Sequence, residues 1–380
     1  MIKRFLFITL FLLTPFSAFS KDWDPRLLDA VKLAYQGKIE TAESTIESYI
    51  QENPEDPNGL FVKGVIWEWK MPLRGLDEKK ENPKILSLYK QASDMAFFQW
   101  DKDQDNVDKL INVGNGYVFL ARKYSDVGSW FKAVLTGKKC QQHLEKALKL
   151  DPTRVDGLVS LGGFHYLADN VPEGAKAFRG ILGIKGDKNL GLNEIRQSFS
   201  KPHPYSLNGQ FLLLSLYEDY EKNYDEALKT LSFFETQFPE NPEFKYKKGR
   251  ILQKKDPNLG IPVLISFADW CSLNAKNCHS NYLFLSYFLA AKNYKILNNP
   301  SKAREMLTKA ISNDSKLDPN KSAEALLWIA QLDQAEGKNP IALEQLERAK
   351  SIQDASKKVK KEIEDTKNQI CSAEKIEGKC

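Results

Sequence analysis

The chain has 380 residues, enough for two or three ordinary domains or for one continuous array of repeats. Of these residues 42% are hydrophobic and 28% are charged, a balance that excludes a disordered polypeptide and indicates a protein with a real core. The formal net charge is only +5, and both signs are mixed along the chain. A nucleic-acid-binding protein usually concentrates its basic residues in a patch or arm, so we expect no nucleic-acid partner.

The first twenty residues differ in composition from the rest of the chain. Two basic residues precede an apolar run over residues 5–16, and Ala18 and Ser20 supply small side chains at a cleavage position. This pattern is typical of a cleavable secretory signal over residues 1–20. We therefore expect an exported protein, periplasmic in a Gram-negative bacterium, with no membrane span after cleavage. An uncleaved anchor is the alternative.

The cysteines fit an oxidising compartment. Cys271 and Cys278 are seven residues apart, Cys371 and Cys380 are nine apart, and Cys140 stands alone. Export favours two short-range disulfides, one in each pair. The rival interpretation is a metal site, but the first pair and the histidine beside it give three ligands without a second close pair of cysteines. We expect no metal and a buried thiol at the lone cysteine.

Six segments share one pair of positions, a small residue followed four residues later by an aliphatic one. They are Ala42/Ile46, Cys140/Leu144, Gly191/Ile195, Ala227/Leu231, Ala303/Leu307 and Ala342/Leu346. In three of them a proline follows the small residue by twelve positions, at Pro54, Pro152 and Pro239. Upstream, a large residue precedes Gly or Ala by four positions, as at Leu60/Gly64 and Leu158/Gly162. A residue without bulk lets two helices approach closely, so each unit is predicted to be a helical hairpin.

Apolar periodicity and helix breakers place the hairpins along the chain. In chain order we expect them at about 24–52, 57–100, 105–150, 154–200, 205–238, 242–275, 280–314 and 321–353. A last charged helix is expected from about 355 to 370. Almost no segment alternates with a period of two, so the predicted fold class is all-α.

These spacings resemble the tetratricopeptide repeat family, whose motif has large, glycine, aromatic, alanine, aliphatic and proline positions at these offsets. The segment 157–192 looks like the central segment of the inclusion-body-clearance group of tetratricopeptide proteins, where a short extra helix and a Gly-Asp turn separate the two helices of a repeat. The resemblance implies an α-solenoid of about eight repeats over residues 21–354, with a capping helix and tail over residues 355–380. It also implies an interaction scaffold, and it names no substrate.

No catalytic signature is present. The four histidines are scattered, and neither a His-Glu-x-x-His nor a Gly-x-Ser-x-Gly motif occurs. The glycine-rich segment lacks the strand and the Lys-Ser/Thr ending of a phosphate loop. His165 lies at an aromatic position of the repeat, where a histidine in the core is the simpler interpretation. We therefore expect a protein that is not an enzyme and uses no cofactor, although a hydrolase acting on envelope polymers remains an alternative.

The resemblance implies a concave groove lined by the first helix of each repeat. The groove positions that we single out are Phe61, Trp69, Tyr166, Tyr246, Arg250, Lys254, Phe288, Lys292, Lys295 and Gln331. Four cations beside two aromatics in the C-terminal half suit an acidic peptide, with the aromatics as anchors and the charges for orientation. The alternative is that these lysines only keep the helices soluble.

Two functions from different classes follow. The first is an exported scaffold that binds a protein partner or an acidic peptide segment in its groove. The second is an accessory protein of a solute-transport or envelope-lipid pathway that encloses a small apolar ligand. A closed pocket formed by Trp130, Phe164, Tyr166 and Phe178 would favour the second. The sequence leaves the partner and the oligomeric state open.

Overall fold

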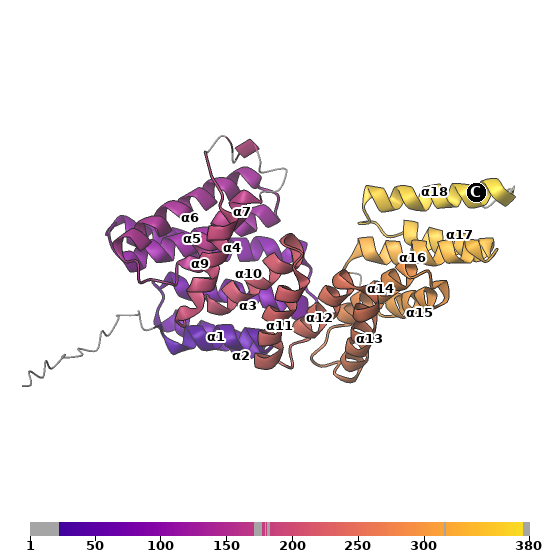
Figure 1. The fold of residues 1–380 in the computed structure, drawn as a ribbon, viewed down its shortest axis with the longest axis horizontal. Helices are drawn as coiled ribbons and strands as arrows, with labels where there is room; N and C mark the ends of the chain where they lie inside the picture. Colours follow the sequence, from indigo (N-terminus) through magenta and orange to yellow (C-terminus); the bar gives the residue numbers. More distant parts are fainter. Residues whose placement is uncertain (1–22, 171–176, 179, 181–182, 315–316, 375–380) are drawn as a thin grey trace, which may run out of the picture.

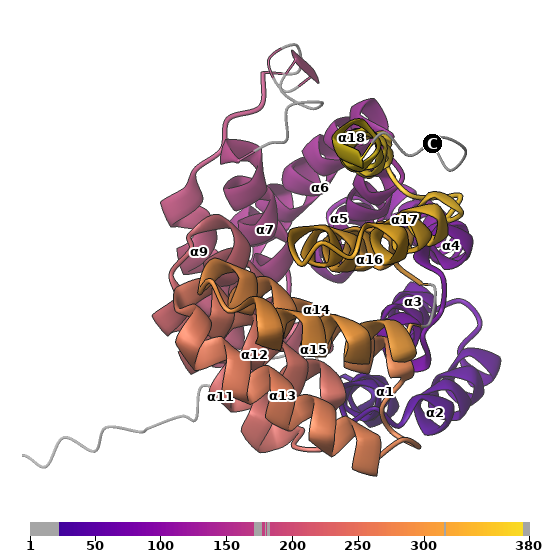
Figure 2. The ribbon, with the colours of Figure 1, turned by 90° about the vertical axis from the view of Figure 1, so that its right-hand side faces the viewer.

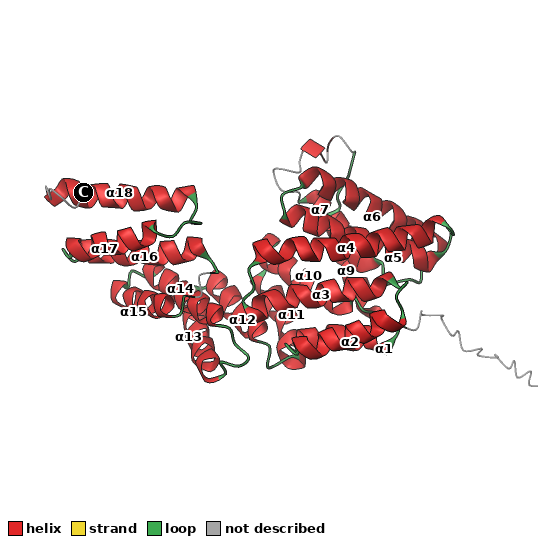
Figure 3. Ribbon diagram, turned by 180° about the vertical axis from the view of Figure 1, so that it is seen from behind, coloured by secondary structure: helices red, strands yellow, loops and turns green. Residues whose placement is uncertain are grey.

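The structure is a computed structural model that describes residues 23–170, 177–178, 180, 183–314 and 317–374. Within these ranges every regular element is a helix, and no strand is present (Figure 3). The all-α prediction is confirmed. The expected signal over residues 1–20 lies outside the described residues.

The helices follow one another as antiparallel hairpins, and each expected hairpin is found. The first four are α1 (Pro25–Tyr35) with α2 (Ile39–Glu52), α3 (Pro57–Arg74) with α4 (Glu78–Asp101), α5 (Val107–Asp126) with α6 (Trp130–Leu150), and α7 (Leu158–Asp169) with α9 (Lys188–Gln197). The next four are α10 (Ser206–Ser215) with α11 (Tyr224–Gln237), α12 (Pro242–Lys255) with α13 (Pro257–Leu273), α14 (Ser280–Ile296) with α15 (Pro300–Ser312), and α16 (Pro319–Ala335) with α17 (Asn339–Lys350). Two short elements, η1 (Ser198–Ser200) and the π-helix η2 (Leu216–Tyr220), and the last helix α18 (Lys357–Glu374) complete the order.

Local sequence explains where many helices begin. Asp24, Asp56, Asn241 and Asp256 each stand before a proline, and each side chain accepts a hydrogen bond from a backbone N–H in the first turn. Asp and Asn satisfy the free donors at a helix start, and proline tolerates the first helical position because its missing N–H would have no partner there. These Asp-Pro and Asn-Pro pairs therefore fix the start of one helix in several hairpins.

The small and aliphatic positions of the six predicted pairs are buried. Both members of the pairs Ala42/Ile46, Cys140/Leu144, Ala227/Leu231, Ala303/Leu307 and Ala342/Leu346 are fully buried. In the remaining pair, Gly191 on α9 touches α7 so closely that a Cβ atom would lie 2.5 Å from the carbonyl oxygen of Gly162. The repeat spacing read from the sequence thus reports the hairpin interfaces.

The helices α1–α11 form one body, and α13–α18 extend away from it beyond α12 (Figure 1). The body closes on itself, because α1 near the N-terminus packs against α10, α11 and α12. The Tyr35 ring stacks on Phe234 and Phe244, with centroid distances of 5.8 Å and 6.3 Å. The amide of Asn241 donates to the Tyr35 carbonyl at 2.8 Å across 206 residues of chain. The first turn of the superhelix is therefore sealed.

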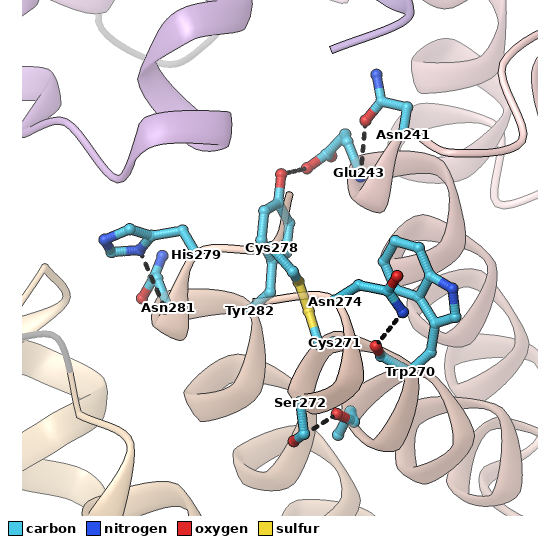
Figure 4. The surroundings of a disulfide bond; sticks show 11 residues. Asn241, Glu243, Trp270, Cys271, Ser272, Asn274, Cys278, His279, Asn281 and Tyr282 are labelled. Carbon is cyan, nitrogen blue, oxygen red and sulfur yellow. Dashed lines mark hydrogen bonds between the residues drawn. A yellow bond between two sulfur atoms is a disulfide. The ribbon is translucent and has the colours of Figure 1, made fainter. Parts of the chain in front are cut away.

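A second long-range contact joins the extension to the body. His279 caps the start of α14, and the Asn281 backbone N–H donates to its Nδ1 at 3.2 Å. The His279 ring packs against Gly75, the residue with a left-handed backbone that ends α3. A Cβ atom on Gly75 would lie 2.2 Å from the ring, so only glycine leaves room for it. His279 follows the disulfide between Cys271 and Cys278 (Figure 4). The disulfide loop thus rests against the N-terminal body.

The Gly162–Gly191 contact gives a stability prediction. In Gly191→Ala the new methyl group would also lie 2.7 Å from the Tyr166 backbone nitrogen, so α7 and α9 must separate. We expect a loss of about 1–3 kcal/mol in the free energy of unfolding, measured by urea titration with circular dichroism. The matched control is Gly137→Ala inside α6. There the new methyl group would meet only Phe164 ring atoms, at 3.3 Å, so we expect a smaller loss. Equal stabilities for the two variants would contradict the packing described for α7 and α9.

Candidate functional site

The aromatic residues expected to line the groove are buried inside the protein. Phe61, Trp69, Tyr166, Tyr246 and Phe288 are all at most 8% exposed. Their rings pack against other rings of the same chain. The groove interior of the N-terminal half is therefore occupied by the protein's own side chains, which corrects the expectation that these rings are open to a partner.

Each ring has an identifiable neighbour. Trp69 lies 4.4 Å from Tyr35 and 5.3 Å from Phe211, measured between ring centroids. Phe61 stacks on Phe119 at 6.1 Å. For Trp69 the physical reason is the closure described above, because α3 faces α10 and α12 across the sealed turn, whereas Phe119 belongs to α5 of the next repeat. Tyr166 packs on Tyr220, Tyr246 on Tyr282, and Phe288 on Trp328.

Two of the four expected groove cations converge on one buried carboxylate. Glu218 lies in the π-helix η2, and its side chain is fully buried. It accepts hydrogen bonds from Arg250 Nε and Nη2 at 2.7 Å, from Lys254 Nζ at 2.9 Å and from Lys247 Nζ at 3.1 Å. Lys254 also donates to Asp219 at 2.7 Å. We call these five residues the Glu218 cluster.

The cluster carries one more cation than carboxylate. Burial alone would favour the neutral acid at Glu218, but the hydrogen bonds from Arg250 and Lys254 and the charges of Lys247 and Arg250 outweigh it and lower its pKa to about 2. Burial conversely lowers the pKa of the Lys247 ammonium, which is only 5% exposed. Arg250 and Lys254 are each 29% exposed, so they share the internal carboxylate and still reach solvent.

The cluster should contribute strongly to stability. Glu218→Gln leaves Lys247 and Arg250 without a counter-charge in a buried place, and we expect a loss of roughly 3–5 kcal/mol in the free energy of unfolding. The matched control is Asp219→Asn on the same turn, whose carboxylate is 46% exposed and should matter by less than about 1 kcal/mol. Denaturant melts of both variants test this, and a small effect of Glu218→Gln would show that the three cations do not depend on it.

The other two expected groove cations lie on α14. Lys292 is exposed, and within the described ranges it makes neither a hydrogen bond nor an ion pair. The Lys295 ammonium lies 4.0 Å from the centre of the Trp328 ring on α16. That ring in turn stacks on Phe288, with centroids 5.0 Å apart and planes inclined by 9°. Lys295 is therefore held over a stacked aromatic pair, and Lys292 is exposed three residues before it on the same helix.

Sequence reasoning missed two apolar residues of the same surface. Leu285 and Leu289 are half-buried, and with Lys292 they occupy positions i, i+4 and i+7 of α14. Residues at this spacing share one helix face, so the exposed lysine continues an apolar stripe. The spacing of these two leucines could have indicated this face, but the same spacing is also expected of residues in the core of a helical hairpin. On α16 the half-buried Gln331 shares a face with Trp328. We call Leu285, Leu289, Lys292, Lys295, Trp328 and Gln331 the α14–α16 face.

The close contacts within the hairpins decide the type of repeat. A Cβ on Gly64 would lie 2.3 Å from the Tyr89 ring, one on Gly114 2.4 Å from Leu144, and one on Gly249 2.7 Å from Leu264. In each case a glycine of the first helix receives a large side chain of the second helix, as at Gly162 and Ile195. The hairpins pack as tetratricopeptide repeats do, and the tetratricopeptide-type fold that the resemblance implied is confirmed.

Comparisons with known proteins agree with this architecture at low similarity. No family model and no curated protein matches the chain. Among solved structures, a human IFIT1 dimer with m7Gppp-AAAA has a TM-score of 0.46 and 14% identity, covering 94% of this chain and 84% of that one. Yeast Tom70 has a TM-score of 0.40 and 14% identity, covering 93% and 82%. PilF of Pseudomonas aeruginosa has a TM-score of 0.38 and 17% identity, covering 69% and 99%. We carry nothing over from these proteins.

The expected disulfide between Cys271 and Cys278 is present, with the Cα atoms 5.3 Å apart. Cys140 is a free, fully buried thiol whose pKa burial raises, as expected for the small position of its repeat. The pairing of Cys371 with Cys380 involves a residue outside the described ones. In the described part of the chain, no group of three or more His, Cys, Asp and Glu side chains could hold a metal ion. None of the described helices is long and apolar enough to cross a bilayer.

His165 forms a buried ion pair with Glu194. Its Nδ1 lies 2.7 Å from Glu194 Oε2 on α9, and its ring is close to the exposed Glu145. Burial opposes the charged imidazole, but the hydrogen bond to Glu194 and the neighbouring carboxylates outweigh it and raise the pKa. The pair ties α7 to α9 next to the Gly162–Gly191 contact.

The His165 pair predicts a pH dependence of stability. Because the folded pKa is raised, the contribution of the pair is fully present below about pH 6.5 and is lost as the pH rises through the folded pKa. The difference in unfolding free energy between the parent and His165→Gln should therefore shrink with rising pH. The matched variant His203→Gln should show the opposite trend, because burial lowers the pKa of that imidazole. A difference for His165→Gln that stays constant from pH 5.5 to pH 9 would contradict the assignment.

Proposed function

We propose that the protein is an exported, non-catalytic scaffold that binds an acidic segment of a protein partner on the concave side of its C-terminal repeats. The observation that carries this proposal is the α14–α16 face, where Lys292 is unpaired among the described residues and Lys295 is held over Trp328. Cations beside a rigid aromatic pair and a half-buried apolar stripe suit an extended acidic peptide.

The Glu218 cluster extends this surface on the neighbouring repeat. The first helices of the last three hairpins, α12, α14 and α16, and the final helix α18 follow one another along a curve (Figure 2). Arg250 keeps its Nη1 free of Glu218 and remains partly exposed. The excess positive charge of the cluster adds to that of α14, so an acidic segment would be attracted along both helices.

Export is supported by two features. The N-terminal sequence has the composition of a cleavable signal. The disulfide between Cys271 and Cys278 is the kind of bond that persists in oxidising compartments such as the bacterial periplasm.

The enclosed-ligand alternative has less support. Tyr166 and Phe164, two of the rings expected to line its pocket, are buried among neighbouring side chains. An open pocket of about 520 Å³ lies instead between α13 and the end of α14, where Ile261, Ile265, Tyr294 and Leu297 are among its lining residues. The observations therefore favour the peptide scaffold.

Reversal of the two α14 cations tests the proposal. Lys292→Glu with Lys295→Glu should slow association with an acidic partner at low salt, because steering depends on charge, and the difference should shrink in high salt. The partner is first identified by crosslinking in the native envelope and mass spectrometry. Stopped-flow or surface-plasmon kinetics at two ionic strengths then give the association rate.

The control is an equal change of net charge elsewhere. Lys149 on α6 and Lys229 on α11 are both exposed, and the double replacement of these lysines by glutamate changes the total charge by the same amount. Circular dichroism verifies that both variants are folded. If the α14 double variant associates at the rate of this control at low salt, the binding surface lies elsewhere.

A further inference from the structure

One carboxylate next to the α14–α16 face has no fixed hydrogen-bond donor among the described residues. Glu324 of α16 is half-buried, and within the described ranges its carboxylate accepts no hydrogen bond and lies within ion-pair distance of no lysine. Most carboxylates of comparable burial in this chain are paired, as Glu68 is with Arg122 at 2.6 Å and Glu218 is with three cations. The Glu324 oxygens are not among the fully buried polar atoms that lack a partner, so the carboxylate can still be reached from solvent.

The surroundings of Glu324 are charged but do not neutralise it. Glu324 lies one helical turn before Trp328 on α16, on the side of that helix that faces α14. The charged groups near it are Lys292 and Lys295 of α14, Lys321 of its own helix and Glu362 of α18. Lys295 is held over Trp328, and Lys321 donates to Asp318. Lys295 and Lys321 thus make their closest contacts with groups other than Glu324.

Burial raises the pKa of the Glu324 carboxyl, and the negative charge of Glu362 adds to the effect, while the lysines act against it. The Glu324 carboxylate therefore has three lysines near it but no fixed hydrogen-bond donor among the described residues, and it can be reached by a cation from outside the chain. The position is next to the surface that we propose for an acidic segment.

We propose that Glu324 receives a cationic side chain of the same partner, so that the partner is an acidic segment with a lysine or arginine close to it in sequence. This inference rests on the proposed function. The acidic part lies against Lys292 and Lys295 on α14, and the cation lies against Glu324 on α16. Such a mixed pattern selects against purely acidic chains, because those would place a like charge at Glu324.

Helix spacing sets the separation of the two parts. Packed helices lie about 8–10 Å apart, and an extended peptide advances about 3.3 Å per residue. The cation should therefore lie about three residues from the acidic residue that meets Lys292. The charges alone do not fix the chain direction, so the cation could stand on either side of the acidic block.

The test uses two fluorescein-labelled peptides and the purified oxidised protein. Each peptide carries a block of alternating Asp and Glu followed by two glycines, and ends in one lysine or in the uncharged norleucine. A second pair has the reverse order. Fluorescence anisotropy gives the affinities, and in at least one order the lysine peptide should bind about three- to fivefold more tightly than its norleucine counterpart.

The matched variants isolate Glu324. Glu324→Gln keeps the shape of the side chain and should remove the preference for lysine while retaining the binding of the norleucine peptide. Glu344→Gln, at an exposed position of α17, should leave the preference unchanged. For the parent, the preference should also fall towards one as the pH is lowered from about 7 to about 4.5, because protonated Glu324 offers no charge. Glu324→Gln should show no such change.

The outcomes separate the two proposals. Equal binding of the lysine and norleucine peptides in both orders overturns the role of Glu324 and leaves the acidic-segment function standing. A preference that survives in Glu324→Gln also overturns it, because the cation is then recognised elsewhere. If neither kind of peptide binds the parent, the proposed function fails and this inference fails with it.

Discussion

The structure depends on the packing of Tyr35 among aromatic rings that come from the other end of the N-terminal body. Its ring lies against Trp69, Phe234 and Phe244, and its carbonyl accepts the amide of Asn241. A tetratricopeptide array normally contacts itself only between neighbouring repeats. Here one turn of the superhelix is sealed, so the first repeat and the sixth share a core.

This closure divides the concave side into two parts with different properties. In the N-terminal half the interior is filled by the chain's own aromatic residues, and it offers no open groove. In the C-terminal half the first helices leave the body and present charged residues over a thin aromatic layer. The Glu218 cluster lies at the junction, where the π-helix η2 meets α12. We therefore propose that the closure decides which repeats are available to a partner.

Much of this fold could be predicted from the sequence, because a hairpin is a local structure. The small position of a repeat and the aliphatic residue four positions later are close in the chain, and their spacing reports a contact between helices; Ala42 and Ile46 are an example. The disulfide between Cys271 and Cys278 was predictable for the same reason.

The state of the groove could not be predicted in this way. Whether Trp69 faces solvent depends on the curvature of the whole array, and its neighbour Phe211 is 142 residues away in the chain. No local pattern encodes that curvature, since it accumulates from small rotations between repeats. Arg250 was assigned correctly to a position on the first helix, but the buried Glu218 that holds it comes from a π-helix that no spacing announced. The sequence therefore predicts where each repeat lies, but it does not predict which residues of a repeat remain open to solvent, because that depends on contacts between distant parts of the chain.

Hydrogen–deuterium exchange with and without the lysine-containing acidic peptide is the measurement that tests the division of the concave side most directly. The account predicts added protection in α14 and α16, with α3 and α7 unchanged and slowly exchanging in both states, because their groove-side rings are already buried. Protection that appears in α3 or α7 when the peptide binds, with α14 and α16 unaffected, would contradict the account.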